Sequence, residues 1–250
     1  TQTHNTQHSP HSLTHSLAHS LSNSLTHFNG RYAWGHDELQ PQTKDGKNWF
    51  SQSGMGVSIL DAMDTMYIMG LKEEFMKARD WIAANLQFDK DNHYNHYNQL
   101  TLTNNTQVGA VSTFETTIRS LGGLLSCYGL TGDPMFVDKA VDLGHRLLKA
   151  FAPDSPIPKA SLISKRKLSP PPPRTTPSPN NNHTNLTMLC SGESKNPGWT
   201  GGKSILAEAG TLQMEFLYLA RITEDPAFAR QVQLSLPPLF FYRHLFLQLL

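Results

Sequence analysis

The chain has 250 residues, a formal net charge of +1 and a hydrophobic fraction of 38%. Its lysines and arginines are dispersed, so the charge pattern argues against a nucleic-acid-binding surface. The hydrophobic fraction is lower than usual for a chain that is globular throughout, and we therefore expect part of the chain to be unstructured.

The two ends differ from the rest of the chain in composition. Residues 1–30 form a Ser/Thr/His/Gln tract with an imperfect His-Ser-Leu repeat, which predicts a disordered low-complexity tail rather than a metal site. This tract lacks the apolar core of a signal peptide. No apolar run approaches the ~18 residues that span a bilayer. Residues 233–250 form an apolar stretch that Arg243 and His244 interrupt. This pattern fits neither a membrane anchor nor part of a hydrophobic core.

Apolar residues recur at helical spacing in three pairs of segments, and this pattern predicts three helical hairpins. A glycine or a Thr-X-Asp-Pro turn separates the two helices of each pair. The expected helices are Met55–Met69 with a second helix after Gly70, Phe114–Leu130 with Pro134–Phe151, and Ser204–Ile222 with Pro226–Val232. The predicted fold class is all-α.

Two of the predicted joints carry the same turn, and they form a weak internal repeat. Asp133 and Asp225 each precede a proline, an arrangement typical of an N-cap followed by the first helical residue. Repeated αα-hairpins bury their apolar faces only against neighbours, so they either close into a ring or stack as a solenoid.

The segment Phe114–Arg119 has the sequence FETTIR and places an acid and a base four residues apart. Residues at i and i+4 share one face of a helix, so Arg119 can orient the Glu115 carboxylate or hold a polar ligand beside it. Taken alone, the pair is more typical of a surface salt bridge. The neighbouring sequence favours a functional site.

Several longer blocks accompany this segment in a fixed order. They are Tyr32–Leu39, Trp49 with Phe50, Asp61–Phe75, Leu130–Asp133, Asp142–Leu148 and Ile205–Phe216. Together with FETTIR they resemble glycoside hydrolase family 47, the class I α-1,2-mannosidases that trim high-mannose N-glycans. The resemblance covers roughly residues 31–90, 111–158 and 197–232.

The resemblance implies an (α/α)7 barrel in which inner helices surround a cavity for the sugar. With three recognisable hairpins, the chain is expected to form an incomplete (α/α)7 barrel over residues 31–232. Polar, irregular inserts interrupt it at 91–109 and 159–196, and residues 233–250 leave the family pattern. An incomplete ring exposes the apolar flanks of its terminal hairpins unless something covers them.

The resemblance also implies roles for individual residues. Glu115 matches the family's catalytic acid, Arg119 matches an arginine that contacts the sugar, and Glu208 matches an acidic position of the cavity wall. Asp64 matches an acidic site residue, although Asp61 lies one turn away and is an alternative; a helix-capping role for both is also open. Glu215 follows Glu208 by seven residues and is either a site residue or a solvent-facing charge.

The family resemblance implies an inverting, Ca²⁺-dependent hydrolase that uses one carboxyl group as acid and another as base. The motifs that supply the family's base and its Ca²⁺-coordinating threonine do not occur in this chain, and no metal ligand is assigned here. Loss of either group typically lowers activity by many orders of magnitude. We therefore expect little or no glycosidase activity from the chain as given.

The leading interpretation is the N-terminal part of an α-1,2-mannosidase. The alternatives are a non-catalytic protein that binds mannose glycans and a helical-repeat interaction protein. The implied partner is a high-mannose N-glycan on glycoproteins. The implied location is the endoplasmic reticulum or Golgi, where family members are often membrane-anchored.

Overall fold

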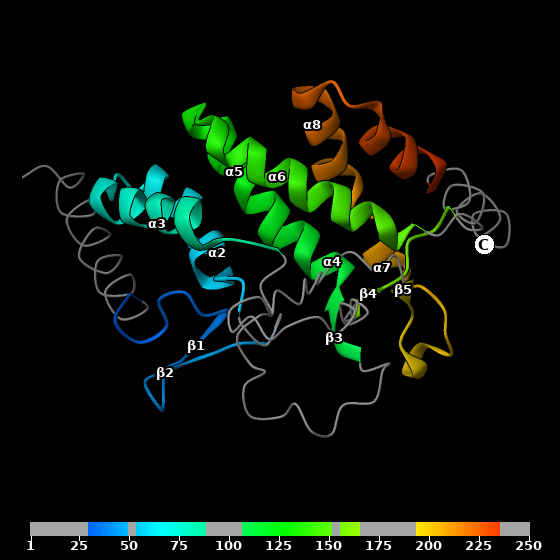
Figure 1. The fold of residues 1–250 in the computed structure, drawn as a ribbon, viewed down its shortest axis with the longest axis horizontal. Coiled ribbons are helices and arrows are strands. Elements are labelled where there is room, and N and C mark those ends of the chain that lie inside the picture. Colours follow the sequence, from blue (N-terminus) through cyan, green and yellow to red (C-terminus); the bar gives the residue numbers. More distant parts are fainter. Residues whose placement is uncertain (1–29, 50–53, 89–106, 152–155, 166–193, 236–250) are drawn as a thin grey trace, which may run out of the picture.

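The computed structural model describes residues 30–49, 54–88, 107–151, 156–165 and 194–235. These residues are mostly helical, and their helices form three hairpins that lie side by side in chain order (Figure 1). The predicted tail of residues 1–30 lies outside the described residues except for Gly30. Of the predicted tail 233–250, only residues 233–235 are described, as the last turn of a helix.

The first hairpin confirms the prediction from sequence. It consists of α2 (Val57–Ile68) and α3 (Lys72–Asn85). Gly70 joins them with a left-handed backbone (φ 75°), a conformation that costs glycine little because it has no Cβ. The buried residues Ile59, Leu60 and Met63 of α2 recur at helical spacing.

The second hairpin begins with a helix that changes its winding. The helix comprises α4 (Thr113–Glu115), a π-helical segment (Thr116–Leu121) and α5 (Gly122–Thr131). The sequence predicted an ordinary helix here. The hydroxyls of Thr116 and Thr117 donate to the carbonyl oxygens four residues earlier, at 2.6 and 2.8 Å, and hydroxyls bonded in this way distort the helical ladder. The hairpin returns along α6 (Pro134–Leu147), which ends in a 3-10 turn (Leu148–Ala150).

The third hairpin differs from the prediction of one helix over Ser204–Ile222. Two helices, α7 (Leu206–Ala209) and α8 (Gln213–Thr223), occupy this stretch. The Thr211 hydroxyl donates to the Ala207 carbonyl oxygen at 2.8 Å and so satisfies a backbone acceptor at the end of α7. A further helix, residues 226–235, completes the hairpin against α8.

The two Thr-X-Asp-Pro joints have the same hydrogen bonds. Thr131 and Thr223 each donate through Oγ1 to the carbonyl oxygen four residues earlier, both at 2.7 Å. Asp133 accepts from the Met135 amide at 3.0 Å, and Asp225 accepts from the Ala227 amide at 2.8 Å. Gly132 and Glu224, between these residues, are both left-handed, at φ 70° and 57°. The internal repeat and both N-caps are confirmed.

Two small sheets accompany the helices, although the sequence predicted no strands. β1 (Glu38–Gln40) pairs with β2 (Asp45–Lys47). The other sheet has the antiparallel order β3 (Gln107–Ser112), β4 (Ser161–Lys165), β5 (Ser194–Lys195). These three strands lie at the edges of the expected inserts, 91–109 and 159–196, whose central parts fall outside the described residues.

One hydrophobic core runs through all three hairpins. The Phe75 and Phe136 ring centroids lie 6.3 Å apart and link α3 to α6, and the same distance separates Phe216 from Phe228 in the third hairpin. Asp37 is a buried carboxylate, and it accepts a hydrogen bond from the Met55 amide at 2.6 Å. Within the described ranges, no helix has both the length and the apolar character needed to span a membrane.

We predict that Asp133→Ala and Asp225→Ala each destabilise the fold, because each removes an N-cap worth about 1 kcal/mol. Asp133→Ala should cost more, since Asp133 also accepts from Arg79 Nε at 2.8 Å. This bond is the main cause of the lowered pKa of Asp133. The extra stability is therefore present above the ordinary carboxyl pKa of about 3.9 and is lost as the pH falls through the lowered value.

Urea unfolding at pH 7 and at pH 3 measures both effects. Asp138→Ala, an exposed position on α6, is the control and should stay within about 0.5 kcal/mol of the wild type. Equal costs for Asp133→Ala and Asp225→Ala at both pH values would contradict the prediction.

Candidate active site

The FETTIR segment forms the helix that carries the candidate site. Ser112 caps its start by accepting from the Glu115 amide at 3.2 Å. Arg119 Nε donates to Glu115 Oε2 at 2.6 Å, so the predicted i, i+4 pair is present. Both residues border or lie within the π-helical segment, and such segments occur frequently at functional sites.

A second carboxylate, from α2, completes the cluster. Arg119 Nη1 donates to Asp61 Oδ2 at 3.1 Å. The Arg119 guanidinium also lies 5.7 Å from the ring centroid of Trp49, within the range of a cation–π interaction. We call Asp61, Glu115 and Arg119 the carboxylate–arginine cluster.

Close packing of α2 against α5 puts Asp61 within reach of Arg119. A Cβ on Gly123 would lie 2.8 Å from the Leu60 carbonyl oxygen, a distance that backbone atoms do not tolerate. Glycine at this position therefore permits the approach of the two helices.

The electrostatics of the cluster are set by two carboxylates sharing one guanidinium. Burial is the largest influence on Asp61 and raises its pKa, while Arg119 lowers it and Glu115 raises it further. The hydrogen bond to Glu115 is the main cause of the raised pKa of Arg119, which stays charged. The cluster carries excess negative charge and several acceptor oxygens, which suits the binding of hydroxyl groups.

Asp64 has a different partner from Asp61. The Ser126 hydroxyl donates to Asp64 Oδ2 at 2.9 Å, and Ser126 lies about two turns along the FETTIR helix from Arg119. Asp64 also accepts from the Thr65 amide at 2.6 Å. The structure therefore brings Asp61, the alternative residue, into contact with Arg119, and places the predicted Asp64 beside it on the same face of α2.

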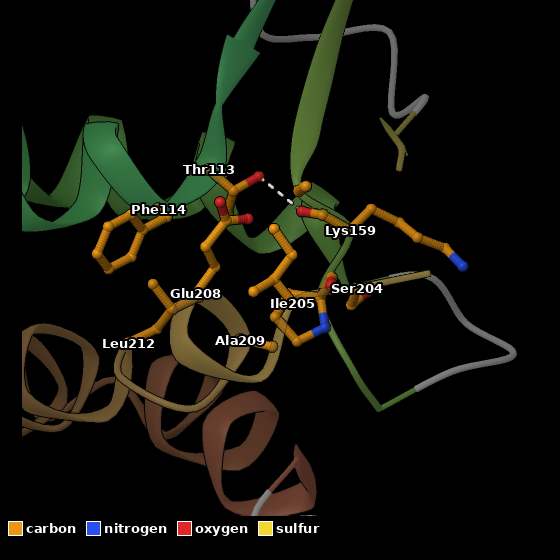
Figure 2. A pocket seen from close by; sticks show the side chains of 10 residues that line it. Thr113, Phe114, Lys159, Ser204, Ile205, Glu208, Ala209 and Leu212 are labelled. Carbon is orange, nitrogen blue, oxygen red and sulfur yellow. Dashed lines mark hydrogen bonds between the residues drawn. The ribbon is translucent and has the colours of Figure 1, made fainter. Parts of the chain in front are cut away.

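Glu208 lies in a separate hollow near the start of the same helix. The hollow has a volume of about 210 Å³ including its open mouth, and Thr113, Phe114 and Leu212 line it together with Glu208. Figure 2 shows the Glu208 carboxylate directed toward Thr113, whose hydroxyl donates to the Lys159 carbonyl oxygen at 2.8 Å. Among the described residues, no hydrogen bond or ion pair joins Glu208 to the carboxylate–arginine cluster.

Glu215 is half-buried rather than solvent-facing. Its Oε2 is enclosed and has no hydrogen-bond partner among the described residues, and burial raises its pKa. Its Oε1 lies 3.8 Å from the point that a Cβ on Gly122 would occupy, so the carboxylate packs against α5. Glu215 therefore places a further acidic group beside the start of α5.

The described residues do not form a metal site. Nowhere in the described ranges do three or more His, Cys, Asp or Glu side chains gather closely enough to hold an ion. The carboxylate–arginine cluster has two carboxylates, but the guanidinium between them occupies the position that a cation would take. These residues therefore do not fit the Ca²⁺ ion that the family resemblance implies.

Sequence similarity to known proteins extends over the whole site. The sequence model of Glycosyl hydrolase family 47 matches residues 29–240, which include the cluster, Asp64, Glu208 and Glu215. The chain belongs to glycosyl hydrolase family 47.

The matches to relatives in family 47 cover about four-fifths of this chain. A mannosyl-oligosaccharide 1,2-alpha-mannosidase of Arabidopsis thaliana, MNS1, is 42% identical over 204 residues, covering 81% of this chain and 29% of the relative. The human endoplasmic reticulum mannosyl-oligosaccharide 1,2-alpha-mannosidase is 36% identical over 203 residues, covering 81% and 22%. The chain thus spans less than a third of the length of these relatives.

A solved structure gives the same fold. The α-1,2-mannosidase from Trichoderma reesei superimposes with a TM-score of 0.62 at 23% sequence identity, covering 89% of this chain and 39% of that chain. Most of the Trichoderma chain lies outside the match.

The sequence identified Glu115, Arg119, Asp64 and Glu208, and the structure brings the first three to neighbouring positions on α2 and the FETTIR helix. It gave Asp61 only as an alternative to Asp64, and it missed the position of Trp49 beside Arg119. Asp61 is 58 residues from Arg119, so no local spacing reveals the contact. The one available signal was a second aspartate at i−3 from Asp64.

We predict that Gly123→Ala destabilises the protein by about 1–3 kcal/mol, because the new Cβ forces α2 and α5 apart. Gly129→Ala on the same helix is the matched control. Its Cβ would meet only the Tyr218 hydroxyl, at 3.2 Å, and alanine favours helix by up to about 1 kcal/mol. Thermal unfolding should therefore rank Gly123→Ala below the wild type and Gly129→Ala at or above it. The reverse order would contradict the close-approach argument.

We predict that Arg119→Gln raises the pKa of Asp61 further above its ordinary value. The guanidinium lowers that pKa against the effect of burial, so its removal leaves burial and the Glu115 charge unopposed. Carbon-13 NMR titration of labelled aspartates measures the change. Lys77→Gln, which removes a cation that lies 4.4 Å from the Trp34 ring, is the control and should leave the Asp61 titration in place.

Proposed function

We propose that the chain supplies one wall of a sugar site that acts in α-1,2-mannosidase chemistry on mannose-containing glycans, high-mannose N-glycans in particular. The observation that carries the proposal is the carboxylate–arginine cluster on the FETTIR helix, with Arg119 bonded to Glu115 at 2.6 Å and to Asp61 at 3.1 Å. Family membership and the names of the relatives support the choice of substrate.

Glu115 is the proposed general acid. Its carboxyl group is held by Arg119 on a capped helix, and a positioned acid contributes typically 10²–10⁴-fold to the rate of bond cleavage. Arg119, Asp64 and Glu208 are proposed to bind the substrate. Carboxylates accept hydrogen bonds from sugar hydroxyls, and the guanidinium donates in a fixed fork geometry.

An inverting reaction also needs a base that activates water on the opposite face of the sugar. The family resemblance places that base and the Ca²⁺-binding threonine in motifs that this sequence does not contain. We therefore propose that the 250-residue chain binds glycan with little or no hydrolysis by itself. Residues 31–232 are proposed as part of an incomplete (α/α)7 barrel, with inserts at 91–109 and 159–196.

The proposed location is the endoplasmic reticulum or Golgi. Its support is the glycan chemistry of the site and the name of the human relative, an endoplasmic reticulum mannosidase. A protein that binds mannose glycans without cleaving them is the second candidate function, and the Arg119 contacts to two carboxylates favour it because they orient binding groups without a metal.

We predict that the chain binds a high-mannose oligosaccharide and that Arg119→Ala weakens this binding at least about tenfold, since the arginine orients both carboxylates. Glu115→Gln should retain most of the binding and abolish any mannose release that the wild type shows. Calorimetry measures binding, and release of free mannose from the oligosaccharide measures hydrolysis.

Glu73→Gln, at the exposed start of α3, is the control and should match the wild type in both assays. Robust mannose release by the wild type would contradict the prediction of low activity. Absence of both binding and release would overturn the proposed function.

A further inference from the structure

One asparagine side chain joins three segments beside the hollow that contains Glu208. Asn196 Oδ1 accepts a hydrogen bond from the Ala160 amide at 2.9 Å. Asn196 Nδ2 donates to the Gly202 carbonyl oxygen at 3.0 Å and to Ser204 Oγ at 3.2 Å. A primary amide can accept at one end and donate twice at the other, whereas a carboxylate of the same shape can only accept. The contacts of Asn196 therefore use the specific chemistry of an amide.

The first of these contacts leads to the start of the FETTIR helix. Ala160, whose amide is bonded to Asn196, accepts through its carbonyl oxygen from the Thr113 amide at 2.9 Å. The Thr113 hydroxyl donates to the neighbouring Lys159 carbonyl oxygen at 2.8 Å. Thr113 is the first residue of α4 and precedes Glu115 by two positions. Asn196 thus helps to hold the backbone on which the start of the FETTIR helix is bonded.

The other contacts lead to the helix that carries Glu208. Ser204 lies two residues before α7, and its hydroxyl donates to the Pro158 carbonyl oxygen at 2.9 Å. Because its one hydrogen is used in this bond, Ser204 Oγ is the acceptor in its contact with Asn196. Glu208 is the third residue of α7. The entry to α7 is therefore bonded to the same stretch, residues 158–160, that meets the FETTIR helix.

The loop between Asn196 and Ser204 is shaped for this connection. Gly201 and Gly202 have left-handed backbones, with φ values of 64° and 76°, which residues with a Cβ rarely adopt. This turn brings the Gly202 carbonyl oxygen back to Asn196. Within the loop, the Pro197 carbonyl oxygen accepts from the Thr200 hydroxyl at 2.8 Å. The loop is thus held by its own bonds, and Asn196 attaches it to the stretch 158–160.

The hollow lies between the segments that Asn196 connects. The described residues that line it include Glu208 and Thr113 and, from the connected stretches, Lys159, Ala160 and Ser204 (Figure 2). Asn196 is half-buried and is not one of the lining residues. Any effect of this asparagine on a bound sugar must therefore pass through the residues that it holds.

We propose that Asn196 is a positioning residue of the sugar site and that it sets the place of the Glu208 carboxylate relative to the FETTIR helix. In the described ranges no hydrogen bond or ion pair joins Glu208 to the carboxylate–arginine cluster, so backbone contacts determine their separation. A displacement of about 1 Å in a site can cost about 10²-fold in rate. The inference rests on the proposed function, because it concerns the assembly of that same site.

The test compares the affinity for a high-mannose oligosaccharide in two backgrounds, measured by protein NMR titration so that weak binding is detected. Asn196→Ala should weaken binding at least about tenfold in the otherwise unchanged chain, because the Glu208 carboxylate is displaced. In a Glu208→Ala background the same change should cost less than about twofold, since the group that it positions is gone. Asn85→Ala is the matched control and should bind like the wild type, although it removes a bond from Nδ2 to the Trp81 carbonyl oxygen on α3.

A second readout does not require a glycan. In Asn196→Ala, carbon-13 NMR of labelled aspartate and glutamate side chains should show a changed chemical shift for the Glu208 carboxyl. The Asp64 carboxyl signal should stay in place, because Asp64 is bonded to Ser126 on another pair of helices. If the wild type binds no oligosaccharide, the proposed function fails and this readout alone decides the positioning role.

Two results would overturn the proposal. One is an equal change of affinity on Asn196→Ala in both backgrounds, which indicates that the asparagine does not act through Glu208. The other is an unchanged Glu208 carboxyl signal in Asn196→Ala. If Asn196→Ala does not fold, Asn196→Asp replaces it in both measurements, since it keeps the acceptor for the Ala160 amide and loses the donor to Gly202.

Discussion

The absence of a side chain at Gly123 determines where the charged groups of the candidate site lie. The backbone of α2 approaches α5 so closely that a Cβ would meet the Leu60 carbonyl oxygen at 2.8 Å. This approach brings Asp61 to Arg119 and Asp64 to Ser126, two contacts that lie one turn apart on α2 and about two turns apart on the FETTIR helix. The site thus depends on a backbone contact, and the ion pairs follow from it.

The ion pairs themselves contribute little to stability. Asp61, Glu115 and Arg119 are all partly exposed, and pairs of this kind are typically worth about 0–1 kcal/mol. Hydrophobic burial along the three hairpins contributes more to the free energy of folding. Because the helices are fixed independently of the charges, Arg119 can exchange a carboxylate contact for a hydroxyl of a ligand at small cost to the fold. This separation of stability from binding suits a sugar site.

The fold was largely predictable where one short-range rule decided the structure. Asp133 and Asp225 before prolines predicted two helix starts, because capping and the fixed φ of proline act within a few residues. Prediction failed where competing local bonds were close in energy. The Thr116 and Thr117 hydroxyls altered the helix after Glu115, and Thr211 helped to divide the expected helix before Gln213.

The candidate site was predictable only in part for a different reason. Glu115 and Arg119 lie on one turn of helix, so sequence spacing sufficed for them. The contact of Asp61 with Arg119 depends on helix packing, which spacing along the chain does not encode. The strands β3 and β4 were missed likewise, because each is short and its partner is distant in sequence.

The β3–β4 pairing also holds the start of the FETTIR helix at the end of the sheet away from the stretches 89–106 and 166–193. In the antiparallel register Gln107 lies opposite Lys165, so the chain enters β3 and leaves β4 at the same end of the sheet. The stretches 89–106 and 166–193 are attached at that end, while the opposite end leads through Ser112 directly into the FETTIR helix. A change in the number of residues in either stretch therefore acts at the end of the sheet away from Glu115, and the entropic cost of joining two fixed points grows only slowly with the number of residues between them.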